Sequence, residues 1–173
     1  MAQYISDSGE LFGSFASPIH IQETITMTAT TTNPTKTHSD YDSITLTDDG
    51  SGYCFVNMKF KNTGTANTSG TGDYLFLLPA GYKFNQNYHP PMTAANWGTQ
   101  YEVVIPGSKA TVGIAGYCST FVVVPYDETR FKLHEHGLDY QGTYNNDRIA
   151  YASGVYGFTT CWFTASFRFK KSI

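Results

Sequence analysis

The stretch Gly70–His89, GTGDYLFLLPAGYKFNQNYH, constrains the fold of this chain more than any other segment. It contains Tyr74–Leu78, a run that is apolar at every position, and Pro79 follows directly. Because side chains alternate between the two faces of a strand, a run of this kind predicts a strand buried on both faces. Proline cannot donate to a sheet ladder, so we expect the strand to end at Pro79 and the chain to turn at Ala80-Gly81.

Several other segments alternate apolar and polar residues, which is typical of half-buried strands. In the segment 53–61 the residues Cys54, Val56, Met58 and Phe60 share one face. The last strand has an inner face of Cys161, Phe163, Ala165, Phe167 and Phe169, and an outer face that includes Trp162, Thr164, Ser166 and Arg168. We expect strands at residues 19–29, 43–47, 53–61, 74–78, 101–105, 110–117, 120–124, 130–133 and 158–170, with turns at Asp48-Asp49-Gly50, at Pro106-Gly107 and near Ser119.

No segment has the periodicity of an amphipathic helix, and no repeat of solenoid length occurs. The strand number and spacing predict an all-β fold, an antiparallel β-sandwich of the jelly-roll type, with residues 18–173 forming one domain. Residues 1–17 show no sustained period and are expected to be an amino-terminal arm that orders against a partner.

The composition narrows the classes of partner. Charged residues are 14% of the 173 residues, against about 25% in an average domain, and the formal net charge is −3. This balance argues against nucleic-acid binding, and no run is long enough for membrane insertion. The start of the chain lacks the pattern of a secretory signal, and Cys54, Cys118 and Cys161 are expected to be buried free thiols rather than disulfides.

Two patterns could carry chemistry, and each has a plainer interpretation. His134 and His136 would point the same way on a strand and offer half of a metal site, but a polar loop with two histidines is the favoured interpretation. Asp48-Asp49 and Asp127-Glu128 are acidic pairs of the kind that glycosidases use, but both fall where turns favour acidic residues. We therefore predict no enzyme activity and no cofactor, we commit to no metal site, and His134 and His136 stay the candidate pair for a metal.

Exposed aromatic residues in loops rich in Asn, Gln, Thr and Gly are the strongest indication of a binding surface. Tyr88, Trp97, Tyr140 and Tyr144 are the candidate residues for binding a receptor or glycan. Aromatic faces can stack on sugar rings, and Tyr and Trp are also enriched at protein interfaces. The alternative interpretation is that these rings cover the ends of the sandwich.

Three segments resemble a known family. Asn33-Pro34-Thr35-Lys36, then Gly72-Asp73-Tyr74-Leu75-Phe76 running into Leu78-Pro79-Ala80-Gly81-Tyr82-Lys83-Phe84, and the final strand Phe163–Phe169 are similar to the carboxy-terminal β-domains of phage and large-virus fibre and tail proteins. The resemblance implies a trimeric jelly roll, of the kind shared with tumour-necrosis-factor-like folds, that serves in attachment or capping on a virion surface.

The residues give one independent reason to expect a trimer. Tyr74–Leu78 and Phe121–Val124 are apolar on both faces, and a second subunit could cover the second face.

The expected function is that of a non-enzymatic viral structural protein at the virion surface, acting in attachment or capsid assembly. Its partners would be two further copies of itself, other virion proteins that bind the arm, and a host surface glycan or protein. Fibre tip, penton and decoration subunit without a receptor role remain open. A carbohydrate-binding module independent of a virus and, last, a glycoside-cleaving enzyme are the alternatives from other classes.

Overall fold

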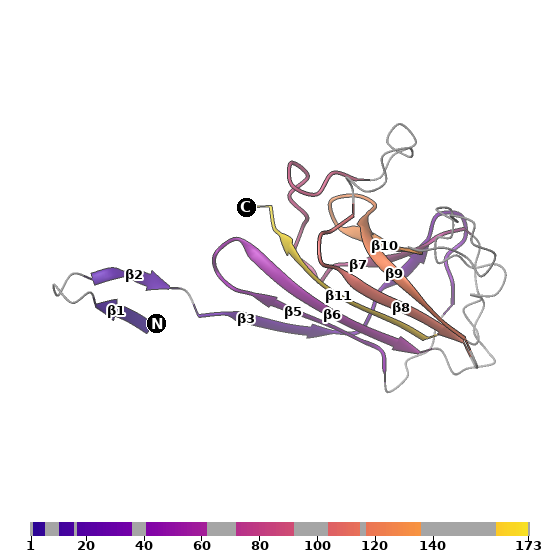
Figure 1. Cartoon of the computed structure of the whole chain (residues 1–173), viewed down its shortest axis with the longest axis horizontal. Helices are drawn as coiled ribbons and strands as arrows, with labels where there is room; N and C mark the ends of the chain where they lie inside the picture. The colour runs from indigo at the N-terminus through magenta and orange to yellow at the C-terminus, as the bar shows by residue number, and fades with distance from the viewer. Residues whose placement is uncertain are drawn as a thin grey trace.

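The structure is a computed structural model, in which residues 2–5, 11–15, 17–35, 41–61, 72–91, 104–114, 117–135 and 162–172 are described. These residues form eleven strands, and no helix occurs among them (Figure 1). The strands are β1 (Ala2–Ile5), β2 (Leu11–Phe15), β3 (Ile19–Glu23), β4 (Met27–Ala29), β5 (Ser43–Asp48), β6 (Tyr53–Lys61), β7 (Tyr74–Leu77), β8 (Lys109–Ile114), β9 (Tyr117–Pro125), β10 (Arg130–Glu135) and β11 (Trp162–Lys170).

Nine of these strands form one antiparallel sheet in the order β3-β5-β6-β11-β8-β9-β10-β7-β4. β3 and β4 are consecutive in the chain but lie at opposite edges of this sheet, since β3 pairs with β5 and β4 pairs with β7. The prediction of one strand over residues 19–29 is therefore wrong. At the break, the Ile25 N–H donates to the Asp42 carboxylate at 2.9 Å, and the chain passes from one edge of the sheet to the other.

Ring contacts across the core show that the sheet is curled. Tyr74 of β7 packs edge-on against Phe163 of β11 with their centroids 5.6 Å apart, and Phe131 of β10 lies 4.9 Å from Phe167 of β11. Four steps across a flat sheet would separate β7 from β11 by about 19 Å. The two halves of the sheet therefore face each other over one hydrophobic core, as an all-β sandwich requires.

The central strands follow the predicted alternation. In β6 the inward residues Cys54, Val56, Met58 and Phe60 are buried, whereas their neighbours face outward. In β11 the inward residues Phe163, Ala165, Phe167 and Phe169 are buried, which confirms the predicted faces of this strand. The predicted turn at Asp48-Asp49-Gly50 is also present, with Gly50 at a φ of 74°.

Strands β7 and β10 are buried on both faces, and so is the end of β9 at Val123 and Val124, whereas Cys118 and Thr120 near the start of β9 are exposed. Leu75 and Val124 lie outside the main core cluster but are only 0% and 1% exposed, and Lys132 and His134 are also buried on the second face of β10. The prediction of strands covered on both faces is confirmed. However, this cover is present within one chain, so these positions do not require a second subunit.

Other boundaries differ from the predictions. The break expected near Ser119 is wrong, because Ser119 lies inside β9 and pairs with Val112 of β8. Ile19 is 54% exposed. The prediction that Cys118 is buried is wrong, because it is an exposed free thiol, whereas Cys54 is buried and free as expected. Most of the predicted strand 101–105 and the start of the predicted strand 158–170, including Cys161, lie outside the described residues.

The amino-terminal segment contains a β-hairpin in which β1 pairs with β2. The two strands form a sheet of their own and do not join the nine-stranded sheet (Figure 1). The expectation that residues 1–17 form an arm that orders against a partner stays a prediction. In the described part of the chain no helix is long and apolar enough to cross a membrane.

Candidate binding site

The structure describes only part of the predicted site. Trp97, Tyr140, Tyr144 and His136 lie outside the described residues. Tyr88 lies in the loop after β7 and is 59% exposed, as expected of a contact residue. His134 lies in β10 and is 4% exposed, which contradicts the interpretation of it as part of a polar loop. Among the described residues no three His, Cys, Asp or Glu side chains gather in a way that could hold a metal ion.

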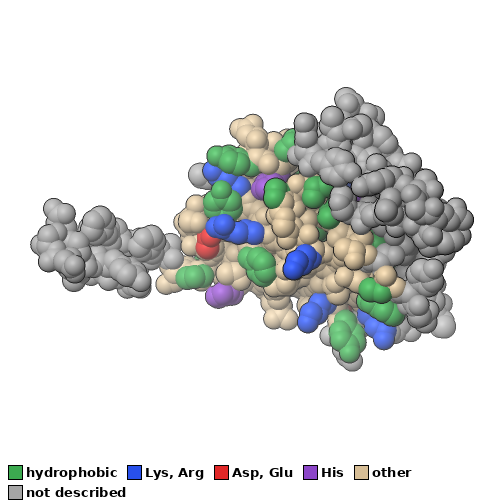
Figure 2. Space-filling view, viewed as in Figure 1, with side chains coloured by type: hydrophobic (Ala, Val, Ile, Leu, Met, Phe, Trp, Pro, Cys, Tyr) green, Lys and Arg blue, Asp and Glu red, His purple; other side chains and the backbone are tan. Residues whose placement is uncertain are grey.

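The outward face of β5, β6, β11 and β8 has an unusual charge distribution. The registers align its residues in rows across the strands, for example Thr45, Asn57, Ser166 and Lys109. Five of the eleven Lys and Arg residues of the chain lie at outward positions of these strands, and no Asp or Glu does. The five are Lys59, Lys61, Lys109, Arg168 and Lys170. Figure 2 shows basic and hydrophobic side chains spread over the region of β5, β6 and β11, with acidic atoms at one place.

A pocket of about 410 Å³ opens where β6 ends and β11 begins. It is lined by Tyr41, Lys59, Phe60, Lys61, Trp162, Phe163 and Thr164. Direct cross-strand pairing sets this lining, because Lys61 lies opposite Trp162 and Lys59 lies opposite Thr164. The lining is mostly apolar, and its residues also bear two ammonium groups, the hydroxyls of Tyr41 and Thr164, and the indole N–H of Trp162.

Two exposed or half-buried aromatic side chains belong to this pocket. Tyr41 is 56% exposed, and the Lys61 ammonium lies 5.9 Å from the centre of its ring. Trp162 is half-buried and packs on Gly113 of the neighbouring strand β8. A Cβ atom at residue 113 would overlap the indole, so only glycine leaves room for the ring in this position. The indole of Trp162 therefore packs directly on the backbone of β8.

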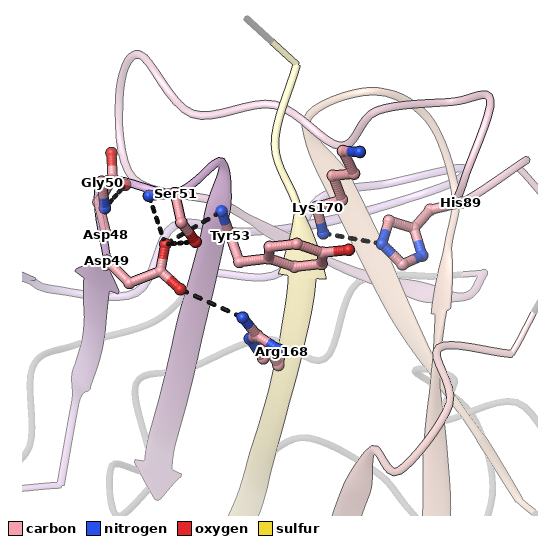
Figure 3. A network of polar contacts seen from close by, with 8 residues as sticks. All are labelled: Asp48, Asp49, Gly50, Ser51, Tyr53, His89, Arg168 and Lys170. Carbon is pink, nitrogen blue, oxygen red and sulfur yellow. Dashed lines mark hydrogen bonds and ion pairs between the residues drawn. The ribbon is translucent and has the colours of Figure 1, made fainter. Parts of the chain in front are cut away.

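A second group of aromatic and cationic side chains lies at the other end of β6 and β11 (Figure 3). The Arg168 guanidinium lies 4.1 Å from the ring centre of Tyr53, and Lys170 lies 3.8 Å from that of Tyr88. A hydrogen bond with Lys170 and the charge of its ammonium lower the pKa of the Tyr88 hydroxyl. Cation–π contacts of this kind hold flexible basic side chains against rings and so order an exposed surface.

The loop around Tyr88 is attached to β11 through His89. The Lys170 N–H donates to His89 Nε2 at 2.9 Å, which requires this nitrogen to be unprotonated (Figure 3). Burial lowers the pKa of His89 and favours the same neutral form. The contact therefore positions Tyr88 beside the end of the last strand.

Both acidic pairs that sequence alone offered as catalytic candidates are engaged in local structure. Asp49 accepts hydrogen bonds from the N–H groups of Ser51 and Tyr53 and pairs with Arg168 at 3.2 Å (Figure 3). Burial would raise the pKa of Asp49, but hydrogen bonds from Ser51, Arg168 and Tyr53 lower it to about 2. These contacts fix the turn between β5 and β6.

Asp127 and Glu128 have the same kind of role in the turn between β9 and β10. Asp127 accepts hydrogen bonds from the N–H groups of Thr129 and Arg130 and pairs with the Arg130 guanidinium at 2.6 Å. Glu128 pairs with Lys83 at 2.9 Å. The Asp127 carboxylate therefore bonds within the turn, and the Glu128 carboxylate pairs with a lysine from the loop after β7.

Sequence reasoning missed the pocket. The sequence predicts Trp162 on the outer face of its strand, as the structure shows, but the predicted aromatic contact residues all come from loops. An outward Trp on a half-buried strand was the available signal. No comparable signal marked Tyr41, whose place beside Lys61 and Trp162 depends on the pairing of β5, β6 and β11.

Comparisons with known proteins add no relative. A scan against protein-family models, a search of curated proteins and a search of solved structures each gave no match. The resemblance to viral fibre domains therefore rests on the quoted segments alone.

Proposed function

We propose that this chain is a non-enzymatic binding protein of a virion surface that attaches to a saccharide through the outward face of β6 and β11. The observation that carries this proposal is the pocket between Tyr41 and Trp162. The virion context comes from the resemblance to viral fibre domains, and the ligand class comes from the pocket.

The chemistry of the pocket suits a sugar ring. The flat apolar surfaces of Tyr41 and Trp162 can cover the C–H face of a ring, while Thr164 and the two lysines can bond its oxygens. The apolar lining and few polar groups are typical of small-ligand sites. Because the indole already packs on the backbone at Gly113, less side-chain entropy is lost on binding than for a ring that makes no such contact.

The experiment is a glycan array screen of the wild-type protein, followed by titration of the best glycan against two variants. Trp162→Ala is expected to weaken binding at least about tenfold, because it removes a large stacking surface, whereas Trp162→Phe keeps a ring and most of the affinity. Unfolding curves for both variants test that each remains folded. Equal binding by Trp162→Ala and wild type would overturn the pocket assignment.

A specific observation also supports a second function, assembly into the virion. The hairpin β1–β2 forms a separate two-stranded sheet, and an isolated hairpin is at best marginally stable in water, so a partner could provide its packing surface. The jelly-roll topology and the trimer belong to this proposal, with the hairpin binding another virion protein.

Deletion of residues 1–17 tests the assembly function. The truncated protein is expected to keep the unfolding temperature of the full chain, because β3–β11 form their own sheet, and to lose particle attachment. Light scattering on the full chain is expected to give three times its 19.1 kDa mass. A monomer that attaches to particles without residues 1–17 would contradict the assembly function and leave saccharide binding untouched.

A further inference from the structure

We infer that the ligand is an acidic oligosaccharide that lies along β6 and β11, from the pocket of Tyr41 and Trp162 to the Tyr53–Lys170 end. This inference rests on the proposed saccharide binding and adds the charge and the length of the ligand.

The outward face of β5, β6, β11 and β8 is positively charged. The protein has a net charge of −3, yet the outward positions of β5, β6, β11 and β8 bear five cations and no carboxylate. Lys59 and Lys109 make no ion pair with any other residue in the described ranges, whereas Arg168 is paired with Asp49. A concentration of one sign of charge on a protein of the opposite sign selects an anionic partner.

Polar uncharged side chains lie between the cations on this face. Asn57 and Ser166 lie between the pocket, which Thr164 lines, and the Arg168 end. These three side chains offer amide and hydroxyl groups. Such groups both donate and accept hydrogen bonds, which matches a hydroxyl-rich chain with spaced negative charges. A nucleic acid would instead require a denser and more continuous basic surface, so we favour the saccharide.

The two aromatic ends of this face are far apart. Trp162 and Lys170 are eight residues apart on one continuous strand, and a rise of about 3.3 Å per residue separates them by about 26 Å. Aromatic side chains stand at both ends, with Trp162 and Tyr41 at one and Tyr53 and Tyr88 at the other. A ligand that contacts both ends must be an oligomer, so affinity should rise with its chain length.

The test compares dextran sulfate with unmodified dextran, which share one backbone and differ in charge. We expect wild-type protein to bind dextran sulfate, to bind longer fractions more tightly, and to lose affinity as salt is added. The double variant Lys59→Gln/Lys61→Gln is expected to bind about tenfold more weakly, since each lysine contributes several-fold at an exposed site. Lys83→Gln is the matched control, because Lys83 is exposed, lies outside these strands and should leave affinity unchanged.

The outcomes separate this inference from the proposed function. Equal binding of dextran and dextran sulfate, or of Lys59→Gln/Lys61→Gln and wild type, would overturn the acidic ligand and leave a neutral saccharide. No saccharide on the array or in these titrations would overturn the proposed function itself. Single-stranded DNA that binds as tightly as dextran sulfate, with the same loss in the double variant, would overturn the saccharide assignment in favour of a general polyanion surface.

Discussion

At the scale of single residues, Asp48 and Lys132 are both charged groups inside the sheet, but their surroundings differ. Asp48 is 3% exposed, accepts a hydrogen bond from the Gly50 N–H at 3.0 Å and pairs closely with Lys171. Lys132 is 5% exposed and reaches Asp73 only at 3.8 Å. The charge of Asp48 is thus balanced by close contacts, whereas the charge of Lys132 is balanced only by a carboxylate at longer range.

We expect Asp48→Asn to lower the free energy of unfolding by about 2–4 kcal/mol, since Lys171 loses a desolvated partner. Urea unfolding at pH 7 measures this change. Glu128→Gln is the matched control, because its ion pair with Lys83 is about half exposed on both sides and should be worth less than about 1 kcal/mol. Similar losses in the two variants would contradict a special role for the buried pair.

The pH dependence gives a second test of Asp48. Burial would raise its pKa, but hydrogen bonds from Lys171 and Gly50 lower it below 3.8. The stabilisation from a carboxylate with a lowered pKa is present above 3.8 and is lost as the pH falls below it. Wild-type protein should therefore lose more stability than Asp48→Asn when the pH is lowered from 5 to 3.

For Lys132 we expect that removal of the charge does not lower the free energy of unfolding. Burial lowers its pKa, although the charge of Asp73 raises it, so the charged form is disfavoured in the folded state. Lys132→Met fills a similar volume without a charge and should leave the free energy of unfolding unchanged or raise it by about 1–2 kcal/mol. Thermal unfolding at pH 7 measures this change, and a loss above 1 kcal/mol would show that the Asp73 pair is a net stabiliser.

At the scale of the elements, β11 organises the core through its inward rings. Phe167 lies 4.9 Å from Phe131 and 6.3 Å from Phe84, ring centre to ring centre, so it connects the two halves of the curled sheet. Phe167→Ala is expected to lower the free energy of unfolding by about 3–5 kcal/mol. Phe55→Ala is the matched control, since Phe55 is 44% exposed on the neighbouring strand and should cost less than about 1 kcal/mol.

The alternation of apolar and polar residues predicted which side chains of a strand face the core better than it predicted which strands pair. The inward and outward residues of β6 and β11 follow from a period of two, because one buried face is enough to impose it. The break between β3 and β4 could not be predicted in this way. It depends on the bond from Ile25 to Asp42, a residue seventeen positions away, and the alternation continues almost unchanged through it.

At the scale of the whole molecule, the candidate site depends on strand order. Tyr88 could be predicted as a candidate contact residue, because it is an aromatic residue in a polar segment of the sequence. The pocket and the basic face were not, because Lys61, Trp162 and Lys109 come from three strands that become neighbours only in the order β6-β11-β8. Sequence reasoning treated the net charge of −3 as an average and so missed its uneven distribution.

The second face of β7 is buried within one chain. Its apolar residues therefore give no reason to expect a trimer. Leu75 is 0% exposed within a single chain, so its cover does not come from another subunit. Leu75→Ala is expected to lower the free energy of unfolding by about 2–5 kcal/mol, as cavity formation requires. Wherever a trimer forms, its interface should lie elsewhere and the variant should keep the oligomeric state of the wild type.

Protein concentration distinguishes the two arrangements for Leu75. If the residue is buried within one chain, the difference in unfolding temperature between Leu75→Ala and wild type stays constant between low and high concentration. If the residue lay at a subunit interface, the variant would dissociate, and the difference would shrink as mass action restored the trimer. Thermal unfolding at two concentrations a hundredfold apart, with light scattering on the same samples, therefore decides whether the second face of β7 is core or interface.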